Sequence, residues 1–246
     1  MTVSVVLPTF REKESIPAML RALDALNLPD LEIIVADDHS PDGTEAAALE
    51  TAKTLRTSVR VEQNPGARGL APSVVHGFSK ASGEILVCMD ADGQHRPEDL
   101  PGLLAEFDRD PALSMVIGSR HVPGGGFTEK WNLFRVMCSD GAAFMARLAL
   151  GISLKDPMSG FFAIRREAFD RVKSCLSPEG FKIMLELAFL LSLTGHDKVL
   201  EHPITFAMRK HGESKLSGRV IAQYLAMLGR FVRTKKAIRR RLAATD

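Results

Sequence analysis

Short apolar runs rich in β-branched residues alternate with helical patterns along the first half of the 246-residue chain. This alternation is typical of βαβ units, in which crossover helices join parallel strands. We expect strands at Val3–Leu7, Leu31–Ala36, Val59–Glu62, Ile85–Met89 and Met115–Gly118, and helices at Ser15–Leu26, Gly43–Leu55, Ala71–Ala81 and Pro97–Asp108. The sequence therefore predicts an α/β fold with a mostly parallel central sheet, whose strands end along one ligand-binding edge.

The pattern changes after Arg120, where three consecutive glycines, Gly124 to Gly126, indicate a loop of unusual shape. Beyond this loop we expect a helix from about Trp131 to Leu150, a strand at Phe161–Arg165, a helix around Phe181–Leu193 and a strand at Ile204–Met208. The hydrophobic content of 45% is enough for one well-buried core.

The C-terminal part of the chain combines an apolar stripe with basic residues. Apolar residues recur at helical spacing from Val220 to Val232, and seven Lys and Arg against one acidic residue lie between Arg230 and Asp246. We expect a catalytic domain over 1–215 and an amphipathic helix over 216–246. This helix either lies at a membrane interface, held by anionic headgroups, or packs on the domain with a solvated basic end. Nucleic acid is not expected as a partner, because no recognisable binding module accompanies the charges.

Membrane spans and disulfides are not expected. No apolar stretch approaches the roughly 18–20 residues that a spanning helix needs. The three cysteines are widely spaced and form no C-x-x-C pair, which favours a reducing compartment. The sequence therefore predicts a cytoplasmic protein that associates with the membrane peripherally.

Two carboxylates and an amide follow the apolar run Ile85–Met89 at alternate positions. In an extended segment the side chains of Asp90, Asp92 and Gln94 point to the same side and can converge. Oxygen ligands without His or Cys suit a hard cation such as Mg²⁺ or Mn²⁺, which commonly binds substrate phosphates. An exposed acidic turn is the alternative for an isolated pair of this kind. The predicted edge position favours a metal site.

A second acidic pair, Asp37-Asp38, ends another apolar run. Clustered carboxylates repel one another unless a cation or a hydrogen-bond donor offsets them, so two such pairs at one edge favour a cation site.

Further motifs follow in order along the chain. They are Val6-Leu7-Pro8-Thr9-Phe10 with Glu12, Asp37 to Thr44, Asp90 to His95 with Pro97-Glu98, Gly118-Ser119-Arg120, Asp156 to Phe162, Phe181-Lys182-Ile183 and Gly212 to Leu216. In these motifs the chain resembles the polyprenyl-phosphate (dolichol-phosphate) mannosyltransferases of glycosyltransferase family 2.

The resemblance implies a Rossmann-like glycosyltransferase A-type fold. It also implies inverting transfer of mannose from GDP-mannose to a polyprenyl monophosphate with Mg²⁺ or Mn²⁺, and it allows for a membrane-spanning partner subunit. The residues expected to bind the nucleotide sugar are Pro8, Phe10, Glu12, Ala36, Asp38, Asp90, Ala91, Asp92, Gln94, Arg120, Arg209 and Lys215. For Phe10 a place in the core is an equal alternative.

The acceptor decides which further groups the reaction needs. A phosphate monoester is already anionic and needs cations, whereas a hydroxyl acceptor needs a general base. Arg120 follows a predicted strand, and Arg135 and Ser139 lie one helical turn apart, so they are expected to hold the acceptor phosphate. The catalytic residues are then Asp92, Arg120 and Arg135. For a sugar hydroxyl acceptor, Asp156 or Glu186 would be the base.

Three positions depart from the pattern of the family near the expected base and ribose site. Arg11 replaces the usual Asn, His39 replaces Gly or Asn, and Arg96 replaces a common Pro. A related transferase that uses UDP-glucose or another sugar nucleotide is therefore the alternative within the same chemistry. The alternative of another class is a nucleotide-sugar-binding subunit without turnover.

Overall fold

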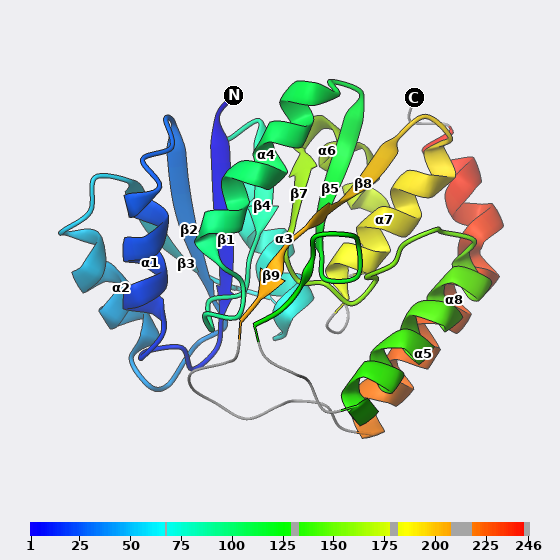
Figure 1. Ribbon diagram of the computed structural model, residues 1–246, viewed down its shortest axis with the longest axis horizontal. Coiled ribbons are helices and arrows are strands. Elements are labelled where there is room, and N and C mark those ends of the chain that lie inside the picture. The colour runs from blue at the N-terminus through cyan, green and yellow to red at the C-terminus, as the bar shows by residue number, and fades with distance from the viewer. Residues whose placement is uncertain (67, 129–132, 178–181, 208–217, 244–246) are drawn as a thin grey trace.

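The computed structural model describes residues 1–66, 68–128, 133–177, 182–207 and 218–243. Within these ranges seven strands form the main sheet in the order β3-β2-β1-β4-β7-β5-β8, and β6 and β9 form a second, two-stranded sheet (Figure 1). Parallel pairs join β1 to β2 and β4, β2 to β3, and β5 to β8, while β7 runs antiparallel between β4 and β5. The sheet is therefore mostly parallel, as predicted.

The bounds of the elements follow the predicted pattern closely in the first half. The strands are β1 Val3–Thr9, β2 Leu31–Asp37, β3 Ser58–Gln63, β4 Ile85–Cys88, β5 Leu113–Ser119, β6 Gly126–Phe127, β7 Phe162–Arg165, β8 Lys198–Pro203 and β9 Thr205–Phe206. The α-helices are α1 Ile16–Ala25, α2 Thr44–Ala52, α3 Leu70–Lys80, α4 Leu100–Arg109, α5 Leu133–Leu150, α6 Arg166–Val172, α7 Ile183–Thr194 and α8 Gly218–Leu242, with short 3₁₀ helices at Pro97–Asp99 and Lys173–Cys175.

The central strands are apolar on both faces because helices cover both sides of the sheet. Val6 and Ile34 belong to the cluster under α3 and α7, whereas Val5 and Ile33, one residue earlier, belong to the cluster under α1 and α4. Helix α3 lies very close to β1, since a Cβ added to Gly77 would stand 2.5 Å from a methyl group of Val6. This packing brings the strand ends and the start of α3 to the same edge.

The prediction of a strand over Ile204–Met208 was partly wrong. The chain forms β8 first, at the edge of the main sheet, and then β9, which pairs with β6. Strand β8 alternates exposed and half-buried residues and includes Lys198 and Glu201. It was missed because an edge strand needs little apolar character.

Helix α8 packs against α5 and α7, and Figure 1 shows α5 and α8 side by side at one end of the molecule. The rings of Phe231 on α8 and Phe189 on α7 stack with centroids 4.8 Å apart. Tyr224 and Leu228 belong to the same core cluster. The C-terminal helix thus contributes to the core, and a boundary between 1–215 and 216–246 stays a prediction. Among the described helices, none is long and apolar enough to cross a membrane.

Candidate active site

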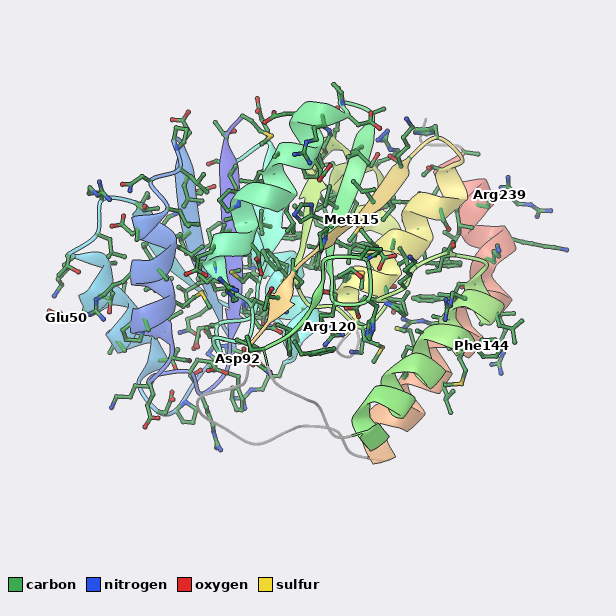
Figure 2. All side chains as sticks on the ribbon, in the orientation of Figure 1. Glu50, Asp92, Met115, Arg120, Phe144 and Arg239 are labelled. Atoms are coloured by element: carbon green, nitrogen blue, oxygen red, sulfur yellow. The ribbon has the colours of Figure 1, made fainter. Side chains whose placement is uncertain are left out.

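The ends of β1, β2 and β4 open onto one cavity, because the three strands are parallel and adjacent. Its volume is about 490 Å³. Figure 2 shows Asp92 and Arg120 at this lower edge of the sheet. The residues that line the cavity are Pro8, Thr9, Phe10, Glu12, Asp38, Arg68, Gly69, Leu70, Ser73, Asp90, Ala91 and Asp92.

The turn after β4 presents the two carboxylates at one end of this cavity. An oxygen of Asp92, which is buried, accepts the backbone N–H of Gln94 at 3.0 Å. The side-chain amide of Gln94 donates to the carbonyl of Ala207 at 3.4 Å, while the N–H of Ala207 donates to the carbonyl of Gln94 at 2.9 Å. The turn is therefore held by the segment that follows β9, and Gln94 lies next to the lining residues.

The donor set fits a hard divalent cation. The extended segment that was expected to align Asp90, Asp92 and Gln94 is a turn in the structure, with Gly93 at a φ of 79°. Asp90 and Asp92 line the cavity with oxygen ligands, and Gln94 in the same turn would add an amide oxygen. Among the described residues no group of three or more His, Cys, Asp and Glu is placed to hold a metal ion. A site of two carboxylates and an amide would leave positions for waters and phosphate oxygens, which is the coordination that Mg²⁺ commonly adopts with nucleotides.

His95 supports the turn that follows β4. Its Nδ1 accepts the backbone N–H of Asp90 at 3.0 Å, and its ring is buried between the rings of Phe161 and Phe206. Because Nδ1 accepts this hydrogen bond, the imidazole ring is neutral and carries its proton on Nε2. A Cβ at Gly160 would stand 2.8 Å from a carboxylate oxygen of Asp90, so a side chain at this position would displace that carboxylate.

Arg120 is held in a fixed orientation beside the site. Its Nε and Nη2 donate to the two oxygens of Asp156, each at 2.7 Å, and its backbone N–H donates to the same carboxylate at 3.0 Å. Both side chains are buried, and the guanidinium lies over the ring of Phe206. Burial raises the pKa of Asp156, but the hydrogen bonds and charge of Arg120 outweigh it and hold the pKa below its ordinary value.

Lys182 is a cation of the site that was not predicted as a site residue. It precedes α7 and lies within the electrostatic reach of Arg120, Asp90 and Asp156. Burial, followed by the charge of Arg120, lowers the pKa of its ammonium to about 8, while the two carboxylates act in the opposite direction. A largely buried ammonium near a carboxylate pair is typical of a site that receives an anion.

The two acids at the end of β2 have different roles. Asp37 is fully buried and accepts hydrogen bonds from Thr9 and Ser40, so it supports the turn. Asp38 lines the cavity and accepts the backbone N–H of Gly69 at 3.0 Å. The pair predicted at the sheet edge therefore contributes one carboxylate to the cavity.

The remaining predicted residues of the base and ribose site are divided between the cavity and the core. Pro8, Phe10, Glu12 and Ala91 line the cavity, and Phe10 is partly exposed there rather than buried in the core. Ala36 is fully buried under α3 and is not among the lining residues.

Four predicted residues cannot be placed by their side chains. Arg135 and Ser139 lie on α5, in the part of that helix whose side chains are outside the described residues. Arg209 and Lys215 also lie outside the described residues. Their roles stay predictions.

The loop that leads into α3 also contributes cavity residues that were not predicted, namely Arg68, Gly69, Leu70 and Ser73. They lie far from the acidic motifs in sequence. The glycines around Arg68 were the only local signal, since they mark a turn before a helix.

Solved structures with this fold bind nucleotides. Glucosyl-3-phosphoglycerate synthase from Mycobacterium tuberculosis, solved with Mn²⁺, UDP and phosphoglyceric acid, is similar with a TM-score of 0.67 and 22% sequence identity, over 97% of this chain and 78% of that chain. The same enzyme with Mg²⁺ and UDP gives a TM-score of 0.66. At this identity the similarity shows the fold alone, and it confirms the predicted glycosyltransferase A-type α/β fold.

Sequence relatives are closer. Dolichol-phosphate mannosyltransferase of Pyrococcus furiosus is 40% identical, over 98% of this chain and 66% of the relative, so the chain spans just under two thirds of that protein. The enzyme of the same name from Saccharomyces cerevisiae is 39% identical, over 92% of this chain and 85% of its own. Undecaprenyl-phosphate mannosyltransferase of Micrococcus luteus is 34% identical, over 94% of each chain. The sequence model of glycosyl transferase family 2 matches residues 4–173, and the chain belongs to that family.

Proposed function

We propose that this protein transfers mannose from GDP-mannose to a polyprenyl monophosphate, with inversion at the anomeric carbon. The observation that carries the proposal is the buried Arg120–Asp156 pair with Lys182 nearby, beside the carboxylates Asp90 and Asp92. Cations and a metal-binding turn at adjacent places suit two phosphate-bearing substrates, a nucleotide sugar and a lipid phosphate.

On the donor side, the cavity is lined by residues that follow three neighbouring strands, β1, β2 and β4. Its volume of about 490 Å³ lies in the range of small-molecule sites. Asp90, Asp92 and Gln94 would hold Mg²⁺ or Mn²⁺ at one end. When bound, the metal would neutralise the charge that develops on the leaving diphosphate. Asp38 and Phe10, farther along the cavity wall, would then contact the nucleoside.

On the acceptor side, the acids that could serve as a general base are engaged by arginines. Asp156 is paired with Arg120, and its lowered pKa makes it a weak base. Glu186 is buried, accepts the N–H of Ser177 at 2.9 Å and lies 3.7 Å from a guanidinium nitrogen of Arg230. A phosphate acceptor, which attacks through an oxygen that is already anionic, needs neither carboxylate as a base.

The names of the curated relatives support the same substrates, since these proteins are named dolichol-phosphate and undecaprenyl-phosphate mannosyltransferases. Arg135 and Ser139 remain our candidates for contacts with the acceptor phosphate, and Arg209 and Lys215 for contacts with the diphosphate. A membrane-spanning partner subunit remains part of the proposal.

The helix pair α5–α8 is the surface that would face the lipid. Its exposed apolar side chains include Phe144 and Leu148 on α5 and Leu225 and Val232 on α8. The end of α8 carries the basic residues Arg233, Lys235, Lys236, Arg239, Arg240 and Arg241. Figure 2 places Phe144 and Arg239 on this helix pair, away from the sheet. Apolar side chains next to basic ones suit an interface with anionic lipid, on which the protein would be peripheral and cytoplasmic.

The transfer experiment uses the purified full chain, undecaprenyl or dolichyl phosphate in vesicles, and radiolabelled GDP-mannose, UDP-glucose and UDP-mannose in parallel. We expect labelled lipid from GDP-mannose, and its loss in Asp92→Ala but not in Glu50→Ala, a carboxylate on the exposed side of α2. Labelled lipid formed only from UDP sugars would reject GDP-mannose as the donor. Full activity of Asp92→Ala in cells would favour a binding subunit without turnover.

The membrane surface is tested by sedimentation with vesicles that contain anionic lipid. Phe144→Ser combined with Leu148→Ser should reduce binding by at least tenfold. Leu49→Ser is the matched control, because Leu49 is an exposed leucine on α2, at the opposite end of the molecule (Figure 1). Equal binding by the double variant and the control would reject this surface.

A further inference from the structure

One wall of the cavity is built by part of the loop between β3 and α3, which no family motif above includes. Asn64 and Gly66 follow β3, and Arg68 and Gly69 precede α3. Residue 67 lies outside the described residues. Arg68, Gly69 and Ser73 line the cavity together with Asp38. Asp90 and Asp92, which would hold the diphosphate through a metal ion, follow β4, and β1 separates β4 from β2 in the sheet. The wall beside Asp38 is therefore where the base of a nucleoside diphosphate would lie.

Asn64 connects the loop to the end of β2. Its side chain is 3% exposed, and its backbone N–H donates to the carbonyl of Asp37 at 3.0 Å. Its Oδ1 accepts the N–H of Gly66 at 3.1 Å, while its Nδ2 faces Asp38 at 3.4 Å and Ser73 at 3.5 Å. Both of these contacts of Nδ2 are long, so each is weak alone, and together they place the amide nitrogen between the carboxylate and α3.

Asp38 is oriented by this wall. Its Oδ2 accepts the N–H of Gly69 at 3.0 Å, its Oδ1 faces Asn64, and its own N–H donates to the carbonyl of Thr9. An ionised carboxylate has about four lone-pair sites, and the wall engages one at each oxygen. The carboxylate can therefore accept two further hydrogen bonds from a ligand in the cavity.

Guanine is the base that matches such a group. It presents two adjacent donors, N1–H and the N2 amino group, which a carboxylate can accept as a charge-assisted pair. Uracil presents one N–H between two carbonyl oxygens, and those oxygens would repel the carboxylate. Adenine presents an acceptor nitrogen next to its amino group.

We infer that Asn64 is a positioning residue that, with the N–H of Gly69, aims Asp38 so that the cavity selects guanine over other bases. The inference rests on one part of the proposed function, namely that the cavity binds a nucleoside diphosphate. Base specificity would then depend on Asn64 and Gly69, which lie between β3 and α3.

The test measures the affinities of GDP, IDP and UDP by calorimetry in the presence of Mg²⁺ and without acceptor. IDP differs from GDP only by the missing N2 amino group. We expect the wild type to bind GDP at least tenfold more tightly than IDP and UDP, which corresponds to about 1.4 kcal/mol. In Asn64→Asp, which keeps the shape but puts a second carboxylate beside Asp38, the preference for GDP over IDP should fall to within about threefold.

Ser73→Ala is the milder variant in case Asn64→Asp does not fold, and it should lower the same preference by a smaller factor. Ser79→Ala is its matched control, since Ser79 lies on the same helix, is exposed, and donates its hydroxyl hydrogen bond to the carbonyl of His76 on its own helix. The inference is overturned if the wild type does not prefer GDP, or if Asn64→Asp and Ser73→Ala weaken the three nucleotides equally, as a ribose contact or a purely structural role would. A wild type that prefers GDP but transfers no mannose would reject the proposed function and leave this inference intact.

Discussion

Replacement of Lys182 by methionine should raise the stability of the protein and lower its activity at least tenfold. Methionine has a similar length and volume but no charge, so the variant removes a buried ammonium without leaving a large cavity. At neutral pH the folded protein must keep this ammonium charged in surroundings that disfavour the charge. The substitution relieves that cost and at the same time removes a cation from the site.

The magnitude follows from the pKa of Lys182, which burial lowers from 10.5 to about 8. A shift of this size corresponds to roughly 3.5 kcal/mol at most, because each pKa unit is about 1.4 kcal/mol. The side chain retains some contact with solvent, so we expect about 1–2 kcal/mol of stabilisation in the variant. For a chain of this size that raises the Tm by about 3–6 °C.

The pH dependence has a definite sign. The folded protein binds fewer protons than the unfolded chain between about pH 8 and pH 10.5, so the wild type gains stability as pH rises through this window. The cost of the buried charge is fully present below about pH 8 and disappears near pH 10.5. The advantage of the Lys182→Met variant should therefore be largest at pH 7 and should shrink at pH 10.

Calorimetric melting at pH 7 and pH 10, in EDTA, measures the stability, and radiolabelled mannosyl transfer measures the activity. We expect transfer to fall by at least tenfold, on the scale of other electrostatic contacts to reacting phosphates. Lys80→Met, an exposed lysine at the end of α3, is the matched control and should change neither quantity appreciably. A lower Tm at pH 7, or undiminished transfer, would refute the reasoning.

Three further substitutions test the surroundings of the site. His95→Leu removes the acceptor of the buried N–H of Asp90, so it should cost about 1–3 kcal/mol and weaken Mn²⁺ binding measured by electron paramagnetic resonance; unchanged Mn²⁺ affinity would count against a supporting role. Asp156→Asn leaves the charge of Arg120 buried and should cost about 3–5 kcal/mol in denaturant melts. The wild-type contribution of this pair should persist down to about pH 4 and decline only below it, because the folded pKa of Asp156 lies under its ordinary 3.8. Arg11→Asn should raise the Tm by about 1–2 °C, because Arg11 has a φ of 62°, a left-handed conformation that Asn tolerates better; a lower Tm would show that its contact with the Phe10 ring is worth more.

The backbone explains two departures from the family pattern. Arg11 and His39 stand where the family usually has Asn, or Gly or Asn, and both have positive φ angles, 62° and 56°. The usual residues are those that adopt this conformation at least cost. The departures thus concern the turns at the ends of β1 and β2, and neither residue is among those that line the cavity.

The sequence by itself determined the family, the α/β class and the place of two acids, Asp90 and Asp92, that line the cavity. Each of these depends on local patterns: alternating elements, an apolar run followed by Asp90, Asp92 and Gln94, and motifs in a set order. The same patterns located the helices and strands of the first half to within a few residues. The edge strand β8 was missed because the sequence Lys198–Pro203 does not alternate apolar and polar residues, and its apolar residues Val199 and Leu200 are adjacent.

Only the tertiary structure decided how the charged side chains are used. Arg120 and its partner Asp156 are 36 residues apart in sequence, and Lys182 lies farther along the chain. At the end of β2, Asp37 and Asp38 are adjacent, yet one is enclosed by hydroxyl donors and the other faces the cavity. Burial and pairing of charges depend on which segments the fold brings together, and neighbouring residues along the chain do not specify those contacts.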